Sequence, residues 1–125
     1  MKDPIYKKVL ASAELIAASG TFPSANVEIG PKIDKDPNVG RLGNFSLELK
    51  LSGNAGVLKA EVKCSGNGVD YITVSPEIET GMSVAAGPYY LVEFAMPLCT
   101  DFTILLTETG GAANVTVDEM SIISR

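Results

Sequence analysis

The sequence contains no histidine and no tryptophan, and only two of its 125 residues are cysteines. Without histidine the chain cannot form a Ser-His or Cys-His pair, the usual arrangement that activates a nucleophile. The cysteines, Cys64 and Cys99, are too far apart in sequence for metal-ligand spacing. We therefore expect no catalytic residues, no metal and no cofactor, and a protein that is not an enzyme.

Long apolar runs are also absent. No stretch approaches the roughly 18 apolar residues of a membrane helix, so no membrane partner is expected. Residues 9–18 follow three lysines, as the core of a signal peptide would, but Glu14 lies in the middle of this segment and favours a strand or short helix instead. The length, with 46% hydrophobic residues, fits one domain over residues 1–125.

The charges are few and unevenly distributed. The net charge is -5; nine of the ten basic residues lie at or before Lys63, and eight of the fifteen acidic residues follow it. No basic cluster exceeds Lys7–Lys8, which argues against a nucleic-acid partner. The asymmetry fits a solvated surface, or a subunit whose one face meets the oppositely charged face of a neighbour.

Two stretches alternate strictly between apolar and charged or small residues, at 45–51 and at 58–64. This period of two predicts two half-buried strands, and the glycines of the intervening Ser52-Gly53-Asn54 segment predict a hairpin turn. Opposite charges favour a register that sets Glu48 against Lys63 and Lys50 against Glu61. The same register places Leu47 opposite Cys64, Leu49 opposite Val62 and Leu51 opposite Ala60, with a loop over 54–57.

A second Ser-Gly-Asn segment, at 65–67, runs into Gly68. Asn-Gly is a strong hairpin signal because both residues tolerate positive φ. We expect a three-residue loop with a bulge before a strand at 71–75, since this keeps Ile72 and Val74 on the face of Val62 and Cys64. Both glycine segments lead into valines and strands rather than into the Gly-Lys-Ser/Thr end of a phosphate-binding loop. They are therefore interpreted as turns.

Further strands are predicted at 90–96, ended by Pro97, at 102–107 and at 114–124, with a short one around Val27 and Ile29. In the last long strand the apolar phase shifts, which indicates a bulge near Asp118–Glu119. The predicted inward residues of these strands are Tyr90, Val92, Phe94, Met96, Phe102, Ile104, Leu106, Val115, Val117, Met120 and Ile122.

The first segment is ambiguous. Asp3, Pro4 and Gly20 would frame a helix, as N-cap, first helical residue and terminator. The alternation of Val9, Ala11, Ala13 and Leu15 favours a strand, and because every other element is β we expect a strand here.

About eight short strands with Gly, Pro and Asn turns predict an all-β fold, an antiparallel two-sheet sandwich or jelly roll. The charged stretch Gly30 to Asn44 is expected to be a long loop that is functional or pinned by a partner. Asp34, Asp36 and Asn38 have the opening spacing of a calcium loop. The required glycine is replaced by Val39 and the required glutamate by Phe45, so a charged loop is preferred.

Other candidate chemistry is sparse. The carboxylate pairs Glu77 with Glu79 and Asp118 with Glu119 fit ordinary solvated surface better than glycoside hydrolysis. Tyr89 beside Pro88 leaves open a carbohydrate-binding module, although such modules usually carry more aromatic side chains. We expect the two cysteines to be free and buried, and the sequence leaves a single disulfide open.

Three stretches carry a resemblance to a known group: LIAASGTFPSANVEIG, FSLELKLSGNAGVLKAEVKCSGNGVDYITV and FTILLTETGGAANVTVDEMSIISR. Their succession of a small-residue strand, glycine-punctuated hairpins and a Thr/Val-rich final strand resembles small β-sandwich accessory proteins of tailed bacteriophage virions. The resemblance implies a structural subunit located in the virion and assembled in the host cytoplasm: a capsid decoration or cement protein, or a neck or tail component. It implies a homo-oligomer whose partners are the major capsid protein or other virion proteins.

A decoration subunit would stabilise the head by bridging neighbouring shell proteins, and a carbohydrate-binding module is the alternative function. Contact surfaces are predicted at the basic N-terminus, in the 30–44 loop and at the turn 87–90, because interface energy concentrates in arginine and tyrosine and opposite charges steer association. The predicted interaction residues are Lys2, Lys7, Lys8, Lys32, Lys35, Arg41 and Tyr89.

Overall fold

A computed structural model describes residues 6–24, 26–28, 44–95 and 99–124 of the chain. These residues form nine strands and no helix. The strands are β1 (Tyr6–Ile16), β2 (Thr21–Pro23), β3 (Val27–Glu28), β4 (Asn44–Ser52), β5 (Leu58–Ser65), β6 (Ile72–Met82), β7 (Tyr89–Ala95), β8 (Asp101–Glu108) and β9 (Val115–Ser124).

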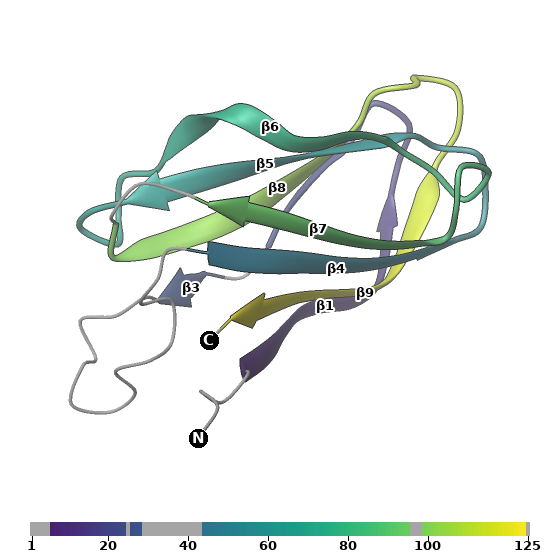
Figure 1. Ribbon diagram of the computed structural model, residues 1–125. Coiled ribbons are helices and arrows are strands. Elements are labelled where there is room, and N and C mark those ends of the chain that lie inside the picture. The colour runs from purple at the N-terminus through teal and green to yellow at the C-terminus, as the bar shows by residue number, and fades with distance from the viewer. Residues whose placement is uncertain (1–5, 25, 29–43, 96–98, 125) are drawn as a thin grey trace.

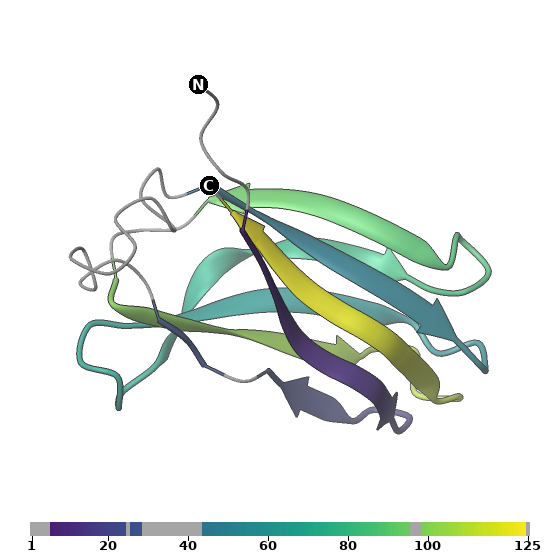
Figure 2. The ribbon, with the colours of Figure 1, turned by 90° about the horizontal axis from the view of Figure 1, so that it is seen from below.

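The strands form two antiparallel sheets that face each other (Figures 1 and 2). The four-stranded sheet has the order β1-β9-β4-β7, and the five-stranded sheet has the order β2-β8-β5-β6 with β3 also paired to β8. Most consecutive strands belong to opposite sheets, and β5 and β6 are consecutive strands paired with each other. This arrangement confirms the predicted all-β, two-sheet antiparallel sandwich.

The core lies between the sheets, where strands of period two bury every second side chain. Phe45 and Phe94 of the four-stranded sheet meet Phe102 of the five-stranded sheet, with ring centroids 5.0 Å apart for Phe45–Phe102 and 6.2 Å for Phe94–Phe102. The predicted inward faces of four strands are confirmed by full or nearly full burial of Phe45, Leu47, Leu49, Leu51, Leu58, Ala60, Val62, Cys64, Phe102, Ile104, Leu106, Val115, Val117, Met120 and Ile122.

The predicted hairpin between 45–51 and 58–64 is wrong, because β4 and β5 lie in different sheets. Leu47 pairs with Val92 and Ile122 instead of Cys64. Glu61 Oε1 lies 3.4 Å from Lys59 Nζ of the same strand, and not beside the predicted Lys50. The predicted pairs of Leu49 with Val62, Leu51 with Ala60, Glu48 with Lys63 and Lys50 with Glu61 fail with it. Alternation fixes which face of a strand is buried but does not fix its neighbour, and the weak charge pairs could not supply that information.

The connection from β4 to β5 crosses between the sheets and is held by long-range contacts. Gly56 donates its N–H to the carbonyl of Asn114 at 3.0 Å, and a Cβ at position 56 would lie 2.7 Å from that oxygen. Glu108, 2% exposed, accepts N–H groups from Ser19, Val57, Gly110 and Gly111 at 2.7–2.9 Å. These four backbone bonds lower the pKa of Glu108 to about 2, so one ionised carboxylate ties three connections together.

The second hairpin has the predicted phase but a longer loop. Cys64 pairs with Ile72 and Val62 with Val74, so both pairs share a face as expected. The three-residue loop is wrong, because β6 begins only at Ile72. Side chains close the longer turn: Ser65 Oγ accepts the N–H groups of Asn67 and Gly68, and Asn67 Oδ1 accepts those of Val69 and Asp70. The second Ser-Gly-Asn segment is thus a turn. β6 also continues past the predicted end at Ser75 to Met82.

The first segment is a strand, as expected, but its alternation is interrupted. A register shift between Val9 and Ala11 leaves Leu10 and Ile16 as the buried side chains, while Val9 and Leu15 are exposed. The predicted bulge in the last strand is confirmed, because Lys50 pairs with Glu119 and Leu51 with Val117, which leaves Asp118 as the extra residue.

Several predictions are only partly covered by the described residues. In β7 Phe94 is buried and Tyr90 packs against the core, while Met96 lies outside the described residues. Val27 is buried in β3, whereas Ile29 is not described. Of the predicted loop at 30–44, residues 30–43 are not described, and Asn44 is the first residue of β4.

Candidate interaction surface

The outer face of the four-stranded sheet brings together side chains from four distant parts of the chain. Because Leu47 and Leu49 of β4 point inward, Glu48 and Lys50 point outward. The ladder places Glu48 beside Leu91 of β7 on one side and Ser121 of β9 on the other. The face is completed by β1, which runs beside β9 (Figure 1) and pairs Val9 with Ser121 and Lys7 with Ile123.

A polar network crosses all four strands of this face. Lys7 Nζ of β1 lies 2.7 Å from Glu48 Oε1 of β4 and 3.3 Å from Glu119 Oε1 of β9. The hydroxyl of Tyr89, in β7, donates to Glu48 Oε2 at 2.7 Å. Glu48 is only 9% exposed, so its carboxylate is largely covered by the partners on either side. We refer to Lys7, Glu48, Tyr89 and Glu119 as the sheet network.

The electrostatics of the network favour a single protonation state at neutral pH. The hydrogen bonds from Lys7 and then from Tyr89 lower the pKa of Glu48. The hydrogen bond to Glu48 raises the pKa of both Lys7 and Tyr89. Glu48 is therefore an anion, Lys7 a cation and Tyr89 a neutral phenol over a wide range of pH. These bonds fix the side chains at the centre of the face.

Apolar side chains lie exposed on the same sheet face as the network. Val9 is 55% exposed, Leu15 62%, Leu91 57% and Tyr89 49%, and the strand register places all four on the outer face of the four-stranded sheet. Two other exposed large apolar residues, Val69 and Ile72, lie in or next to the turn between β5 and β6. Exposed apolar side chains with polar groups beside them are common in protein contact sites.

Two of the predicted interaction residues, Lys7 and Tyr89, meet in the sheet network. Lys8 is exposed and donates to the carbonyl of Asn26 at 3.3 Å, away from the network. The other predicted interaction residues, which are Lys2, Lys32, Lys35 and Arg41, lie outside the described residues, as do Asp34, Asp36 and Asn38 of the calcium-like stretch.

Sequence reasoning missed Glu48 and Leu91 as members of this face. Glu48 was assigned to the wrong neighbouring strand. Leu91 is out of phase with Tyr90, Val92 and Phe94, and this mismatch is the signal that could have identified an exposed apolar residue.

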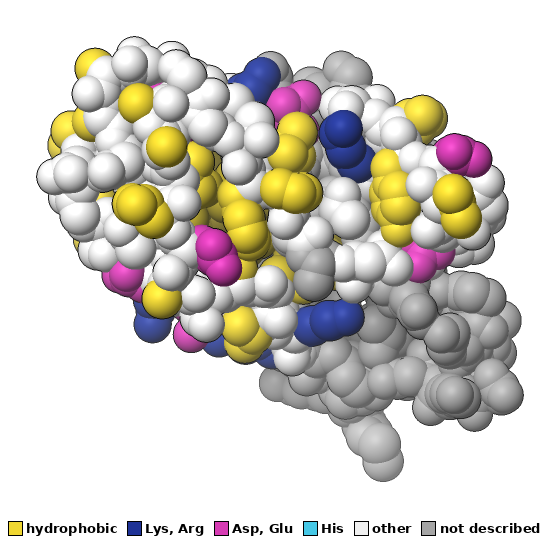
Figure 3. All heavy atoms as spheres, turned by 180° about the vertical axis from the view of Figure 1, so that it is seen from behind, with side chains coloured by type: hydrophobic (Ala, Val, Ile, Leu, Met, Phe, Trp, Pro, Cys, Tyr) yellow, Lys and Arg dark blue, Asp and Glu magenta, His cyan; other side chains and the backbone are white. Residues whose placement is uncertain are grey.

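On the side of the five-stranded sheet, the described residues do not present a cluster of one charge. Figure 3 views the side of the five-stranded sheet, where basic and acidic side chains are interspersed among polar and apolar ones. In the described part of the chain, no group of three or more His, Cys, Asp or Glu side chains could hold a metal ion. Nor do the described residues include a helix that is long and apolar enough to cross a membrane.

The fold and this surface define the chain as an antiparallel β-sandwich module. No family model matches the sequence, and no curated protein matches it. Among solved structures, a chain of the infectious bursal disease virus T13 particle is similar, with a TM-score of 0.58 and 14% identity over 97% of this chain. The VP2 subviral particle of the same virus gives a TM-score of 0.57 and 14% identity, again over 97% of this chain.

The chain spans about a third of the length of these viral proteins, 30% and 32% respectively. The CBM22-1 xylan-binding domain of Paenibacillus barcinonensis Xyn10C is also similar, with a TM-score of 0.43 and 9% identity over 93% of this chain and 83% of that domain. At 14% identity the two viral structures support the β-sandwich fold alone.

Proposed function

We propose that the chain is a virion structural protein, a capsid decoration or cement subunit that bridges neighbouring shell proteins. It acts by adhesion and not by catalysis, through the outer face of the four-stranded sheet. The proposed location is the assembled virion, and the proposed partners are the major capsid protein or other virion proteins and further copies of the chain. If the chain is instead a neck or tail component, the same face binds a different virion protein.

The observation that carries the proposal is the composition of that face. Three exposed aliphatic side chains, those of Val9, Leu15 and Leu91, share the face with a network in which Lys7 and Tyr89 are held in place by Glu48. Side chains that are ordered before binding lose less conformational entropy at an interface. Tyrosine is among the residues in which interface energy concentrates. The face is therefore suited to a partner with an apolar, partly polar surface.

The fold supports the proposal without identifying the virus. Similar sandwiches occur in chains of an icosahedral virus particle. The order of strands and turns in the sequence resembles that of phage accessory proteins. A standard protein interface buries about 1,200–2,000 Å² in total. Many copies on one shell would add avidity to a modest single contact.

Carbohydrate binding is the second candidate function. The described residues favour it less, because Tyr89 is the one aromatic side chain among their exposed large apolar residues and its hydroxyl is already bound to Glu48. A sugar platform usually needs an aromatic ring free to stack on the ligand.

The test is co-sedimentation of the purified chain with shells of the virion whose genome encodes it. We expect saturable binding at a fixed ratio to the capsid protein. Leu91→Asp should weaken binding at least tenfold, because it places a charge on the proposed face. The matched control Val69→Asp changes an exposed apolar residue in the β5–β6 turn and should bind as the parent chain does. Absence of the chain from purified virions, together with no binding to shells, would overturn the proposal.

A further inference from the structure

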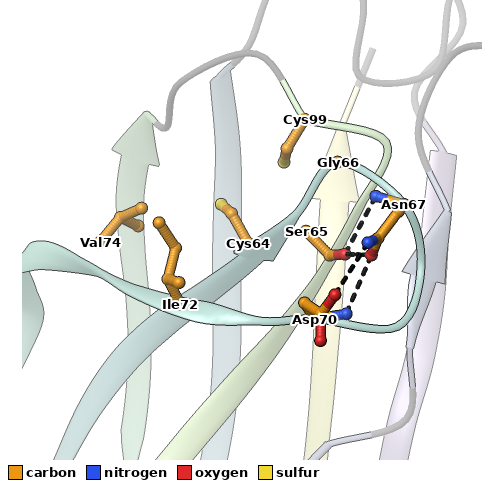
Figure 4. Close-up of a pocket in the computed structure, with 8 residues that line it drawn as sticks. All are labelled: Cys64, Ser65, Gly66, Asn67, Asp70, Ile72, Val74 and Cys99. Carbon is orange, nitrogen blue, oxygen red and sulfur yellow. Dashed lines mark hydrogen bonds between the residues drawn. The ribbon is translucent and has the colours of Figure 1, made fainter.

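A cavity of about 440 Å³ lies at the end of β5, and none of its lining residues belongs to the sheet network (Figure 4). Its apolar lining consists of Cys64, Ile72, Val74 and Cys99, and the turn 65–70 supplies its polar rim. The rim is satisfied by its own bonds, including those from Asn67 Nδ2 to Asp70 Oδ2 at 3.0 Å and from Ser65 Oγ to Asn67 Oδ1 at 3.0 Å. The two thiols are the reactive groups in the lining of this cavity.

The two thiols face one another across the cavity from different parts of the chain (Figure 4). Cys64, in β5, is buried, while Cys99, in the connection before β8, is half-buried. Burial, and after it the proximity of Cys99, raises the pKa of the Cys64 thiol. Neither thiol is in a disulfide, Cys99 is less buried than the sequence predicted, and the structure places both in the lining of one cavity.

The backbone holds the two cysteines in place. Thr100, which follows Cys99, donates both its N–H and its hydroxyl to the carbonyl of Ser65, which follows Cys64, at 2.9 and 3.1 Å. The β5–β8 ladder continues this contact, with Ser65 paired to Asp101. A disulfide forms without backbone movement only when its two residues are already close and suitably directed. Here hydrogen bonds between the residues that follow each cysteine keep the two segments adjacent.

We propose that Cys64 and Cys99 form a redox site that closes to an intramolecular disulfide when the chain meets a small-molecule disulfide such as oxidised glutathione. The closed bond joins the connection before β8 to the end of β5. Because β6 and β7 lie within the loop that it closes, the bond restricts the unfolded chain across strands of both sheets. In a reducing cytosol the pair stays open, and in oxidising surroundings it closes.

The reaction has two steps, and the structure indicates their order. Cys99 is the more accessible thiol; as thiolate it attacks one glutathione sulfur, forms a mixed disulfide and releases one glutathione. Cys64 then gives up its proton and attacks the Cys99 sulfur, which releases the second glutathione. Two protein thiols are oxidised and one glutathione disulfide is reduced to two thiols. Burial and the Cys99 neighbour raise the pKa of Cys64 to about 12, so the second step should be the slower one.

The experiment is titration of the folded chain with reduced and oxidised glutathione, followed by intact mass, thiol counting and peptide mapping. We expect a monomer that has lost two hydrogens and both free thiols, with a Cys64–Cys99 peptide and no retained glutathione. The oxidised chain should melt several degrees above the reduced one. Cys99→Ser should abolish the oxidised monomer, and Cys64→Ala should accumulate a glutathione adduct on Cys99.

Peptide mapping of the parent chain reads the bond directly, so the test does not depend on the folding of either variant. A stable glutathione adduct on the parent chain would overturn the proposal. A disulfide-linked dimer, or thiols that stay reduced in the folded chain where the unfolded chain is oxidised, would overturn it equally. None of these results bears on shell binding, so failure here is distinguishable from failure of the proposed function.

Discussion

Replacing Phe102 by leucine, alone and together with Phe45→Leu, tests the contact that joins the two sheets. Phe102 of β8 is fully buried, and its ring centroid lies 5.0 Å from that of Phe45 in β4. The rings meet at an interplanar angle of 61°, an edge-to-face arrangement. Leucine keeps each site apolar while it removes the ring contact, so both single variants should remain folded.

The expected magnitudes follow from burial and from ring geometry. Each substitution removes about one to two methylene equivalents at ~0.8 kcal/mol each, so each single variant should lose ~1–2 kcal/mol of unfolding free energy. An aromatic pair contributes a further ~0.5–1.5 kcal/mol beyond its buried area. This pair contribution is lost in either single variant and cannot be lost twice. The double variant should therefore be destabilised by ~0.5–1.5 kcal/mol less than the sum of the singles.

The assay is urea unfolding followed by far-UV circular dichroism, because the chain has no tryptophan. Leu91→Ala, on the outer face of the four-stranded sheet, is the matched control and should be additive with Phe102→Leu. Residues without contact usually add within ~0.3–0.5 kcal/mol. If Phe45 and Phe102 are also additive within this range, then β8 does not pack on β4 and the assigned sandwich is wrong.

Three further predictions concern the connections and the sheet network. Glu108→Gln should lower stability at neutral pH. Because the folded pKa of Glu108 is about 2 against a usual 4.5, the stability that its carboxylate contributes is present above pH 4.5 and is lost as pH falls toward 2. This loss should be missing from the acid unfolding curve of the variant. Gly56→Ala should cost about 1–3 kcal/mol in urea unfolding, because its Cβ meets a carbonyl, whereas Gly66→Ala, which meets nothing within 4 Å, should change stability by less than ~0.5 kcal/mol. Glu48→Gln should lower the pKa of Tyr89, measured as phenolate absorbance during alkaline titration, because the acceptor loses its charge; an unchanged titration would contradict the network.

Local patterns predicted the elements well and their neighbours poorly. Strict alternation identified the buried faces of β4, β5 and β8, because burial of every second residue is a property of a single strand. The partner of β4 depends on residues more than forty positions away, Leu91 and Ser121 among them. Cross-strand charge pairs of ~0.2–1 kcal/mol are too weak to decide between such partners. The hydrophobic contact between two whole sheets decides instead.

The two Ser-Gly-Asn segments also show that a local pattern does not determine which distant residues it contacts. In the second, Ser65 and Asn67 bond to backbone groups within three residues, so the segment specifies its own turn. In the first, Asn54 bonds to Asn114 at 2.8 Å, sixty residues away. The same three residues thus make a local hairpin turn in one place and a crossing between sheets in the other, and only the distant partner distinguishes them.

The proposed interaction surface is even less accessible to sequence reasoning, because it exists only once the strands are assembled. Lys7 and Tyr89 each had a chemical reason to be named, but Glu48, which joins them, lies 41 residues from both in sequence. Its carboxylate satisfies a cation on one side and a phenol on the other, and this arrangement leaves the apolar side chains around it without a partner in the described structure. The outer sheet face thus holds its polar groups in place through their own bonds, while its leucine and valine side chains remain exposed. Folding therefore orders the side chains of this contact surface before any partner binds.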